Sequence, residues 1–180
     1  RCPHISNDHD INHDRRGYQG IAIPHKAIPL RGGMLEMDPP EHRWYRSMLN
    51  PYLSPAAVKR WEPLIHEVVR ASLDEKIEEG RIDFVDDLAP AVLTLAMLGI
   101  PLRDWRIYSE PTHALVYTPE DSPEAPRVAE ANMQMAMELM AHVNEIREHP
   151  RHGIINGLVN MRINGEPPPE MDILGMLTLL

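Results

Sequence analysis

The sequence predicts a mainly α-helical protein with little β-structure, and three observations support this fold class. Several segments repeat apolar residues every three or four positions, which is the spacing of an amphipathic helix. Prolines and glycines stand between these segments, where helices begin and end. The remaining stretches leave little room for a sheet, and the chain has no internal repeat.

The first predicted helix runs from Pro39 to about Asn50. Prolines are tolerated in the first turn of a helix, where the amide groups have no intrahelical partner. Asp38 is placed to cap these amides, and Glu41 would complete an acidic capping box. We expect Pro51 to close the helix.

Two further helices follow in the first half of the chain. Ser54-Pro55 is a cap followed by a proline, and apolar residues then recur at helical spacing as far as Gly80. Residues 81–85 form a short strand or an extended link. Asp86 or Asp87 then caps a helix with an almost wholly apolar interior at 91–98. Gly99, with a proline shortly after it, ends that helix.

The second half predicts one long helix between weaker segments. Residues 102–117 form a weaker helical segment broken by Pro111, and residues 118–126 form a loop rich in proline and acid. The longest helix follows at 127–149, and a short one at 153–161. On the long helix we expect one apolar face, formed by Ala129, Met133, Ala136, Met137, Met140 and Val143.

The last segment contains a tight turn and an apolar helix. Asn164-Gly165 is a pair favoured in two-residue hairpins, and three prolines then lead into a helix at 171–180. A nearly all-apolar helix is typical of the interior of a larger protein. The opening Arg1-Cys2-Pro3 is not a natural start, so we interpret the chain as part of a longer protein.

The amino-acid composition limits the kinds of molecule that this protein can bind. The 180 residues are 43% hydrophobic, enough for one domain with a core, and carry a formal net charge of −9. This charge argues against nucleic acid or an anionic membrane surface as the main partner. No apolar run approaches the roughly 20 residues that span a bilayer, and no signal peptide opens the sequence. The single cysteine, Cys2, excludes an internal disulfide and a multi-cysteine metal site, so we expect a soluble cytoplasmic protein.

His42 and Arg46 are the candidate functional residues. They stand at positions i and i+4 of the first predicted helix, so they project from one face beside apolar residues. Two basic groups in this arrangement weaken an isolated helix by roughly 0.2–0.5 kcal/mol when both are charged. A shared anion would reverse this cost. From spacing alone, two solvated basic residues on an amphipathic helix remain an alternative.

The motif around this pair resembles the C-helix region of the bacterial cytochromes P-450. The matching residues are Met37-Asp38-Pro39-Pro40-Glu41-His42-Arg43-Trp44-Tyr45-Arg46, followed by Leu49-Asn50-Pro51-Tyr52-Leu53-Ser54-Pro55. Three later segments resemble the same family in the same order: 82–101 its E helix, 155–165 its H helix and hairpin, and 171–180 the opening of its I helix. The resemblance implies the N-terminal part of the P-450 fold, from about the B helix to the start of the I helix.

The resemblance also implies a function. The family uses heme, held by a cysteine thiolate, to insert one oxygen atom of dioxygen into an organic substrate. At the matching positions, His42 and Arg46 would bind a heme propionate. Electrons would come from a separate ferredoxin or flavodoxin-like donor, because no flavin or nicotinamide motif is present. Arg43 or Arg60 would be candidates for contact with that donor.

Other parts of the family pattern have no match here. Nothing resembles the cysteine-ligand loop, Cys2 lies at the wrong end, and the E-x-x-R pair is absent. The acid–alcohol pair of the I helix would follow Leu180. We therefore expect residues 1–180 to be a partial single domain, truncated before the oxygen-activating part of the I helix and the cysteine-ligand loop. An alternative is an inactive truncated helical binding protein that presents the His/Arg pair to another anion.

Substrate contacts are predicted from the resemblance and from apolar character. Stretches with few charges suggest a small apolar organic substrate. The candidate contacts are Ile21, Ala22, Ile23, Leu30, Leu115, Val116 and Leu179.

Two further patterns have ordinary interpretations. His4, His9 and His13 invite a metal site but more simply form a polar surface segment. The methionines of the long helix favour core packing, and a mobile lid over the substrate is the alternative.

Overall fold

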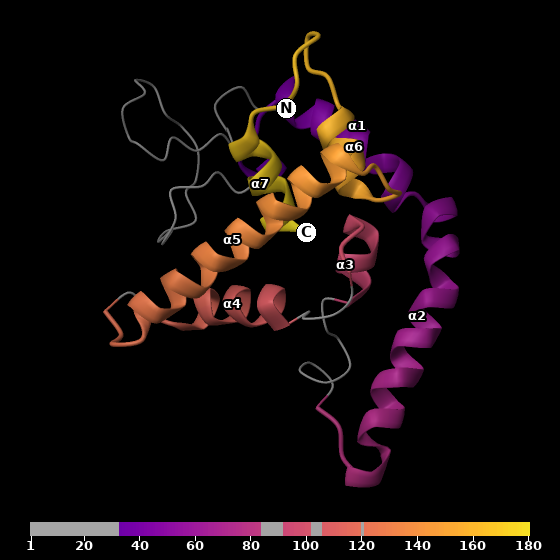
Figure 1. Ribbon diagram of the computed structural model, residues 1–180, viewed down its shortest axis with the longest axis vertical. Coiled ribbons are helices and arrows are strands. Elements are labelled where there is room, and N and C mark those ends of the chain that lie inside the picture. Colours follow the sequence, from indigo (N-terminus) through magenta and orange to yellow (C-terminus); the bar gives the residue numbers. More distant parts are fainter. Residues whose placement is uncertain (1–32, 84–91, 102–105, 120) are drawn as a thin grey trace.

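A computed structural model describes residues 33–83, 92–101, 106–119 and 121–180, and within these residues the fold is helical (Figure 1). This confirms the predicted fold class. The elements are a 3-10 turn η1 (Gly33–Glu36), α1 (Glu41–Leu53), α2 (Pro55–Lys76), a 3-10 turn η2 (Ile77–Glu79), α3 (Val92–Leu98), α4 (Arg106–Tyr117), α5 (Ala125–Glu148), α6 (Ile154–Asn160) and α7 (Glu170–Leu179).

Most helix boundaries follow the local signals. The Ser54 hydroxyl accepts a 3.2 Å hydrogen bond from the Ala57 amide and so caps α2. Gly80 ends the following turn with φ 66°, and Gly99 ends α3 with φ 87°. The predicted caps at Asp86 and Asp87 lie outside the described residues.

The predicted hairpin turn is confirmed. Asn164 and Gly165 have φ values of 54° and 93°, and Ile163 and Glu166 exchange two backbone hydrogen bonds. Positive φ at both central residues is the signature of a type I′ turn, which the Asn-Gly pair adopts readily. The turn places α7 directly after α6.

The prolines at positions 51 and 111 do not end helices, contrary to prediction. Pro51 lies inside α1, where the carbonyl that loses its partner belongs to Ser47, an exposed residue with access to water. Pro111 lies inside α4 and is buried against α5, where the Asn132 side-chain amide donates to the Pro111 carbonyl at 3.0 Å. Tertiary contacts at this helix outweigh the lost backbone bond.

The start of α1 also differs from the prediction. The helix begins at Glu41, with Pro40 at its N-cap and no side-chain hydrogen bond to the cap. Asp38 contributes its backbone carbonyl, which accepts a 3.0 Å hydrogen bond from the His42 amide.

The core lies where α1, α3, α5, α6 and α7 meet, while α2 runs along one side of the molecule (Figure 1). Its largest fully buried side chains are Met37, Tyr45, Leu49, Leu95, Val143, Ile146, Ile154, Ile155, Leu158, Ile173 and Met176. The apolar α7 packs against η1, α5 and α6, as its composition requires. No helix in the described ranges combines the length and apolar character needed to cross a membrane.

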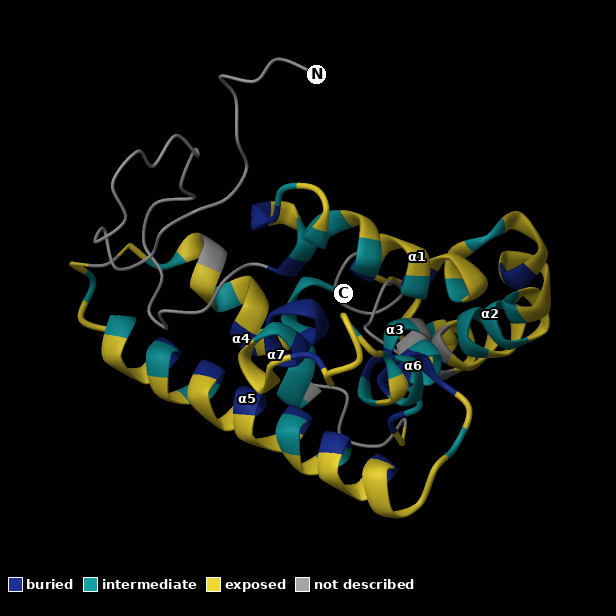
Figure 2. Cartoon of the chain, turned by 90° about the horizontal axis from the view of Figure 1, so that it is seen from above, coloured by how far each residue is buried: buried dark blue, intermediate teal, exposed yellow. Residues whose placement is uncertain are grey.

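The buried face of α5 is rotated from the predicted one. Met133 and Met137 are 51% and 68% exposed, while Met135 and Leu139 are buried. Buried and exposed residues alternate along α5 as one side faces the rest of the molecule (Figure 2). Core packing is therefore correct for only some of the methionines. Apolar residues occur on more than one side of this helix, so its contacts with α4, α6 and α7 decide which side is buried.

Two close backbone contacts depend on glycine. A Cβ on Gly33 would lie 2.7 Å from the carbonyl oxygen of Gly175, where η1 meets α7. A Cβ on Gly153 would lie 2.5 Å from the carbonyl oxygen of Leu98, where the start of α6 meets the end of α3. These contacts fix the segment that precedes α1 and the segment that follows α5.

Candidate functional site: a histidine–arginine pair on α1

The predicted pair lies on one side of α1. His42 is in the first turn and half-buried, and Arg46 is one turn later and exposed. Within the described ranges, neither side chain has a recorded hydrogen bond or ion pair. The structure thus confirms the helix and the spacing, and both side chains are available to bind an anion.

The surface beside the pair changes from basic to apolar along the helix. Leu49 and Leu53 continue the spacing of His42 and Arg46, so all four share one stripe of α1. Leu49 is fully buried and Leu53 is 40% exposed. A ligand with a carboxylate and an apolar body matches this stripe, because the basic groups donate charge-assisted hydrogen bonds and the leucine offers apolar contact. The residues present fit a heme propionate.

A hydrogen bond behind the pair joins α1 to α7. The Tyr45 hydroxyl donates to Asp172 Oδ2 at 2.9 Å, and the Tyr45 side chain is fully buried. Sequence analysis named Tyr45 only as part of the C-helix motif and gave Asp172 no role. The available signal was an aspartate in the first turn of a nearly all-apolar helix, because such a residue often has a partner.

The predicted substrate contacts fall into three groups. Ile21, Ala22, Ile23 and Leu30 lie outside the described residues. Leu115 is on α4 and 39% exposed, and Val116 is on the same helix. Leu179 lines a cavity of about 260 Å³ between α3, α4, α5 and α7. Substrate contact at these positions remains a prediction.

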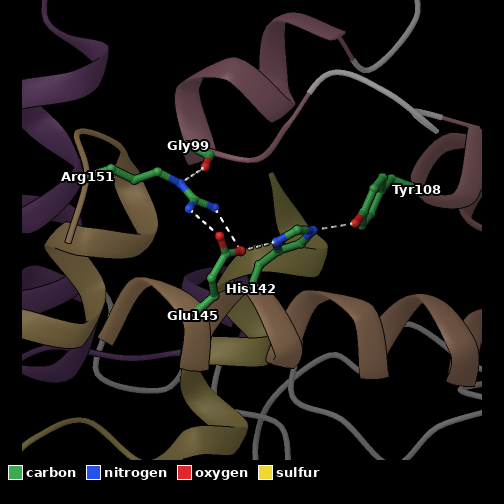
Figure 3. A network of polar contacts seen from close by, with 5 residues as sticks. All are labelled: Gly99, Tyr108, His142, Glu145 and Arg151. Carbon is green, nitrogen blue, oxygen red and sulfur yellow. Dashed lines mark hydrogen bonds and ion pairs between the residues drawn. The ribbon is translucent and has the colours of Figure 1, made fainter. Parts of the chain in front are cut away.

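A polar network joins α4, α5 and the end of α3 near this cavity (Figure 3). Arg151 donates to both carboxylate oxygens of Glu145, at 2.7 and 3.2 Å, and its Nε donates to the Gly99 carbonyl at 2.6 Å. His142 Nδ1 lies 3.2 Å from Glu145, and its Nε2 lies 3.0 Å from the hydroxyl of Tyr108, which lines the cavity. Sequence reasoning missed this network because Tyr108 and Gly99 lie 34 and 52 positions from the partners that they bind on or after α5.

The charge of Glu145 sets the direction of these hydrogen bonds. The hydrogen bonds from Arg151 and then from His142 lower the pKa of Glu145 from 4.5 to about 2. An ionised carboxylate only accepts, so Nδ1 of His142 carries the proton. In neutral His142, Nε2 then accepts from the Tyr108 hydroxyl. The network holds the cavity wall in place and does not contact the α1 pair.

The sequence also raised a metal site at His4, His9 and His13, which lies outside the described residues, as does Cys2. Within the part of the chain that the structure describes, no group of three or more His, Cys, Asp or Glu side chains is arranged to hold a metal ion. His42 and Arg46 on α1 therefore remain the candidate site, and the ligand that we expect there is a carboxylate.

Comparison with known proteins identifies the family. No family model matches the chain. Linalool 8-monooxygenase of Pseudomonas putida is 32% identical over 97% of the chain, and erythromycin C-12 hydroxylase of Saccharopolyspora erythraea is 30% identical over 86%. A mutant of P450 EryK in complex with erythromycin B superposes over 84% of the chain with a TM-score of 0.69 and 28% identity. The chain belongs to the bacterial cytochrome P450 family. This P450 therefore comes from a family of heme monooxygenases, as its C-helix motif implied.

The match covers only part of the related proteins. The chain spans 42% of the linalool enzyme, 40% of the erythromycin hydroxylase and 41% of the EryK structure. A Mycobacterium marinum P450 in complex with pseudoionone gives a TM-score of 0.72 at 25% identity, with 83% of this chain and 38% of that chain covered. The described P450 elements thus correspond to about two fifths of a typical relative.

Proposed function

We propose that this chain forms the propionate-binding part of a heme-dependent monooxygenase that inserts one oxygen atom from O2 into an apolar organic substrate. The observation that carries the proposal is the His42/Arg46 pair, one turn apart on α1 and beside an apolar stripe. Bound heme b would supply the activation of oxygen. The chain's own residues would bind and orient its carboxylate edge.

Each member of the pair has a defined role in this proposal. The planar guanidinium of Arg46 can donate two parallel hydrogen bonds to a carboxylate. His42 donates from one ring nitrogen and is half-buried, so it also helps to exclude water from the propionate. Because both groups are on a single helix, the direction of α1 sets the direction of the bound carboxylate.

The proposal also includes the heme ligand, the substrate and the electron donor. The thiolate ligand and the proton-delivery residues would belong to a segment outside these 180 residues, because the relatives are more than twice as long. The apolar substrate would contact residues such as Leu179. Electrons would come from a separate ferredoxin or flavodoxin-like protein in the cytoplasm.

The test is heme retention in the protein expressed at its natural length. We expect Arg46→Ala and His42→Ala each to speed the transfer of heme to apomyoglobin by about tenfold, since each removes a charge-assisted hydrogen bond. Lys59→Ala is the control, because Lys59 is an exposed cation on a different helix, α2. Helical content should be unchanged in all three variants.

An absorbance spectrum completes the test. A strongly red-shifted Soret band after reduction and exposure to carbon monoxide would support a thiolate-ligated heme. Parental heme retention in both the Arg46 and His42 variants would contradict the propionate assignment. A protein with no heme band, whose His/Arg pair still binds other carboxylates, would instead be the inactive helical binding protein.

A further inference from the structure

The hydrogen bond between Tyr45 and Asp172 is a second link to the proposed site. Tyr45 lies one residue before Arg46 and three after His42, on the buried side of α1. Its hydroxyl reaches Asp172 Oδ2 at 2.9 Å, in the first turn of α7. Tyr45 is fully buried and Asp172 is half-buried, so the bond is largely protected from water.

This bond restrains the rotation of α1 about its own axis. A helix with side chains has a radius of about 5–6 Å, so a rotation of about 20° moves an outer atom by about 2 Å. That displacement would break the bond between Tyr45 and Asp172. The same rotation would carry His42 and Arg46 by a similar distance, which is enough to lose a charge-assisted hydrogen bond of about 2.7–2.9 Å.

The apolar contacts of α1 restrain its rotation less strictly than a hydrogen bond does. Leu49 and the aromatic ring of Tyr45 are buried by apolar packing, which is not directional. Prolines before the helix and Pro51 within it reduce the number of backbone bonds at both ends. The directional bond near the middle of α1 therefore helps to distinguish one rotation from its neighbours.

We propose that Tyr45 and Asp172 are positioning residues for the anion pair. Their hydrogen bond holds α1 at the rotation in which His42 and Arg46 meet the same carboxylate. This inference rests on the proposed function, since it takes the carboxylate to be a heme propionate. Neither Tyr45 nor Asp172 touches that carboxylate.

Tyr45→Phe is the central variant, because it keeps the buried ring and removes only the hydroxyl. In the heme-loaded protein at its natural length, we expect heme transfer to apomyoglobin to be about tenfold faster, as for loss of a hydrogen bond to a charged group. Asp172→Asn keeps an acceptor oxygen and should stay much closer to the parent. Tyr117→Phe is the matched control, because Tyr117 is 79% exposed.

A double-mutant cycle separates positioning from general stability. If Tyr45 acts through the pair, Tyr45→Phe should add less than about twofold to heme loss in the Arg46→Ala background. A merely structural role would give the same acceleration in both backgrounds, and that result would overturn the inference. Far-ultraviolet circular dichroism and the urea midpoint check that each variant is folded.

The outcomes also distinguish this inference from the proposed function. Fast heme loss in the Arg46 and His42 variants, with parental retention in Tyr45→Phe, would overturn the inference and leave the proposed function in place. Parental retention in the Arg46 and His42 variants would overturn both. Fast loss in Tyr45→Phe that disappears in the Arg46→Ala background supports both.

Discussion

The corner where α1 meets α7 and the corner where the end of α3 meets the segment between α5 and α6 are both joined by polar side chains, but in different surroundings. At the first corner the Tyr45 hydroxyl donates to Asp172, and the tyrosine is fully buried. At the second, Arg151, Glu145, His142 and Tyr108 form several bonds, and those of the Arg151–Glu145 ion pair are exposed to solvent (Figure 3). The number of bonds is therefore a poor guide to their effect, because water competes for exposed groups and not for buried ones.

The largest expected effect comes from the backbone contact that supports the exposed network. A Cβ at Gly153, which has φ 156°, would lie 2.5 Å from the Leu98 carbonyl oxygen. Gly153 precedes α6 and Leu98 ends α3, so both backbones are held by their helices. Gly153→Ala should therefore cost about 3 kcal/mol in the free energy of unfolding, measured by urea denaturation. This would show that the second corner is held by its backbone more than by its charges.

Gly80→Ala is the control for this substitution. Gly80 also has a positive φ, of 66°, but nothing lies within 4 Å of an added Cβ. Its cost should be limited to the backbone conformation, at about 1–2 kcal/mol. Equal losses in the two variants would contradict the role given to the contact with Leu98.

The next effect tests the buried corner. Tyr45→Phe removes a hydrogen bond to a carboxylate and should cost about 2 kcal/mol of unfolding free energy. Tyr117→Phe, at an exposed position, should stay within about 0.5 kcal/mol of the parent. A loss in the Tyr45 variant no larger than in the Tyr117 variant would remove the contrast between the two corners.

A smaller effect is expected when the exposed network loses its cation. Arg151 has a side chain that is 32% exposed, and its Glu145 partner is 45% exposed. Arg151→Ala should therefore cost about 1 kcal/mol at low salt, and less at high salt, because ions screen an exposed pair. Urea midpoints at two salt concentrations would measure this. A salt-independent loss would indicate that the bond to the Gly99 carbonyl dominates instead.

The smallest effect concerns pH. The pKa of Glu145 is lowered from 4.5 to about 2 by Arg151 and then by His142. A lowered pKa favours the folded state above the unfolded value, so this contribution is complete above pH 4.5 and is lost as the pH falls towards about 2. Arg151→Ala should flatten the fall in stability across this interval, as followed by acid unfolding. An unchanged slope would show that Arg151 does not set this pKa.

The sequence predicted features that depend on neighbours in the chain. The cap at Ser54, the helix end at Gly99 and the turn at Asn164-Gly165 each act over a few residues, and the structure confirms all three. The spacing of His42 and Arg46 is equally local, because it requires only that the segment be helical.

Features that depend on distant residues were predicted less well. The buried side of α5 is decided by three other helices, so Met133 and Met137 were placed wrongly. Pro111 remains inside α4, where it is buried against α5 and its carbonyl accepts a hydrogen bond from Asn132. The partner of Tyr45 was missed for the same reason. That His42 and Arg46 bind heme stays a prediction, because the spacing of two basic residues on a helix does not specify the anion that they bind.

The bond between Tyr45 and Asp172 has a consequence for the order of folding. The two residues are 127 positions apart, whereas the members of the ion pair between Glu145 and Arg151 are 6 apart. Closing a long loop costs more chain entropy, so distant contacts form late. During synthesis α1 leaves the ribosome long before α7 exists. The pair on α1 would therefore acquire its final orientation only after α7 has been made and has docked, and heme capture would follow that step.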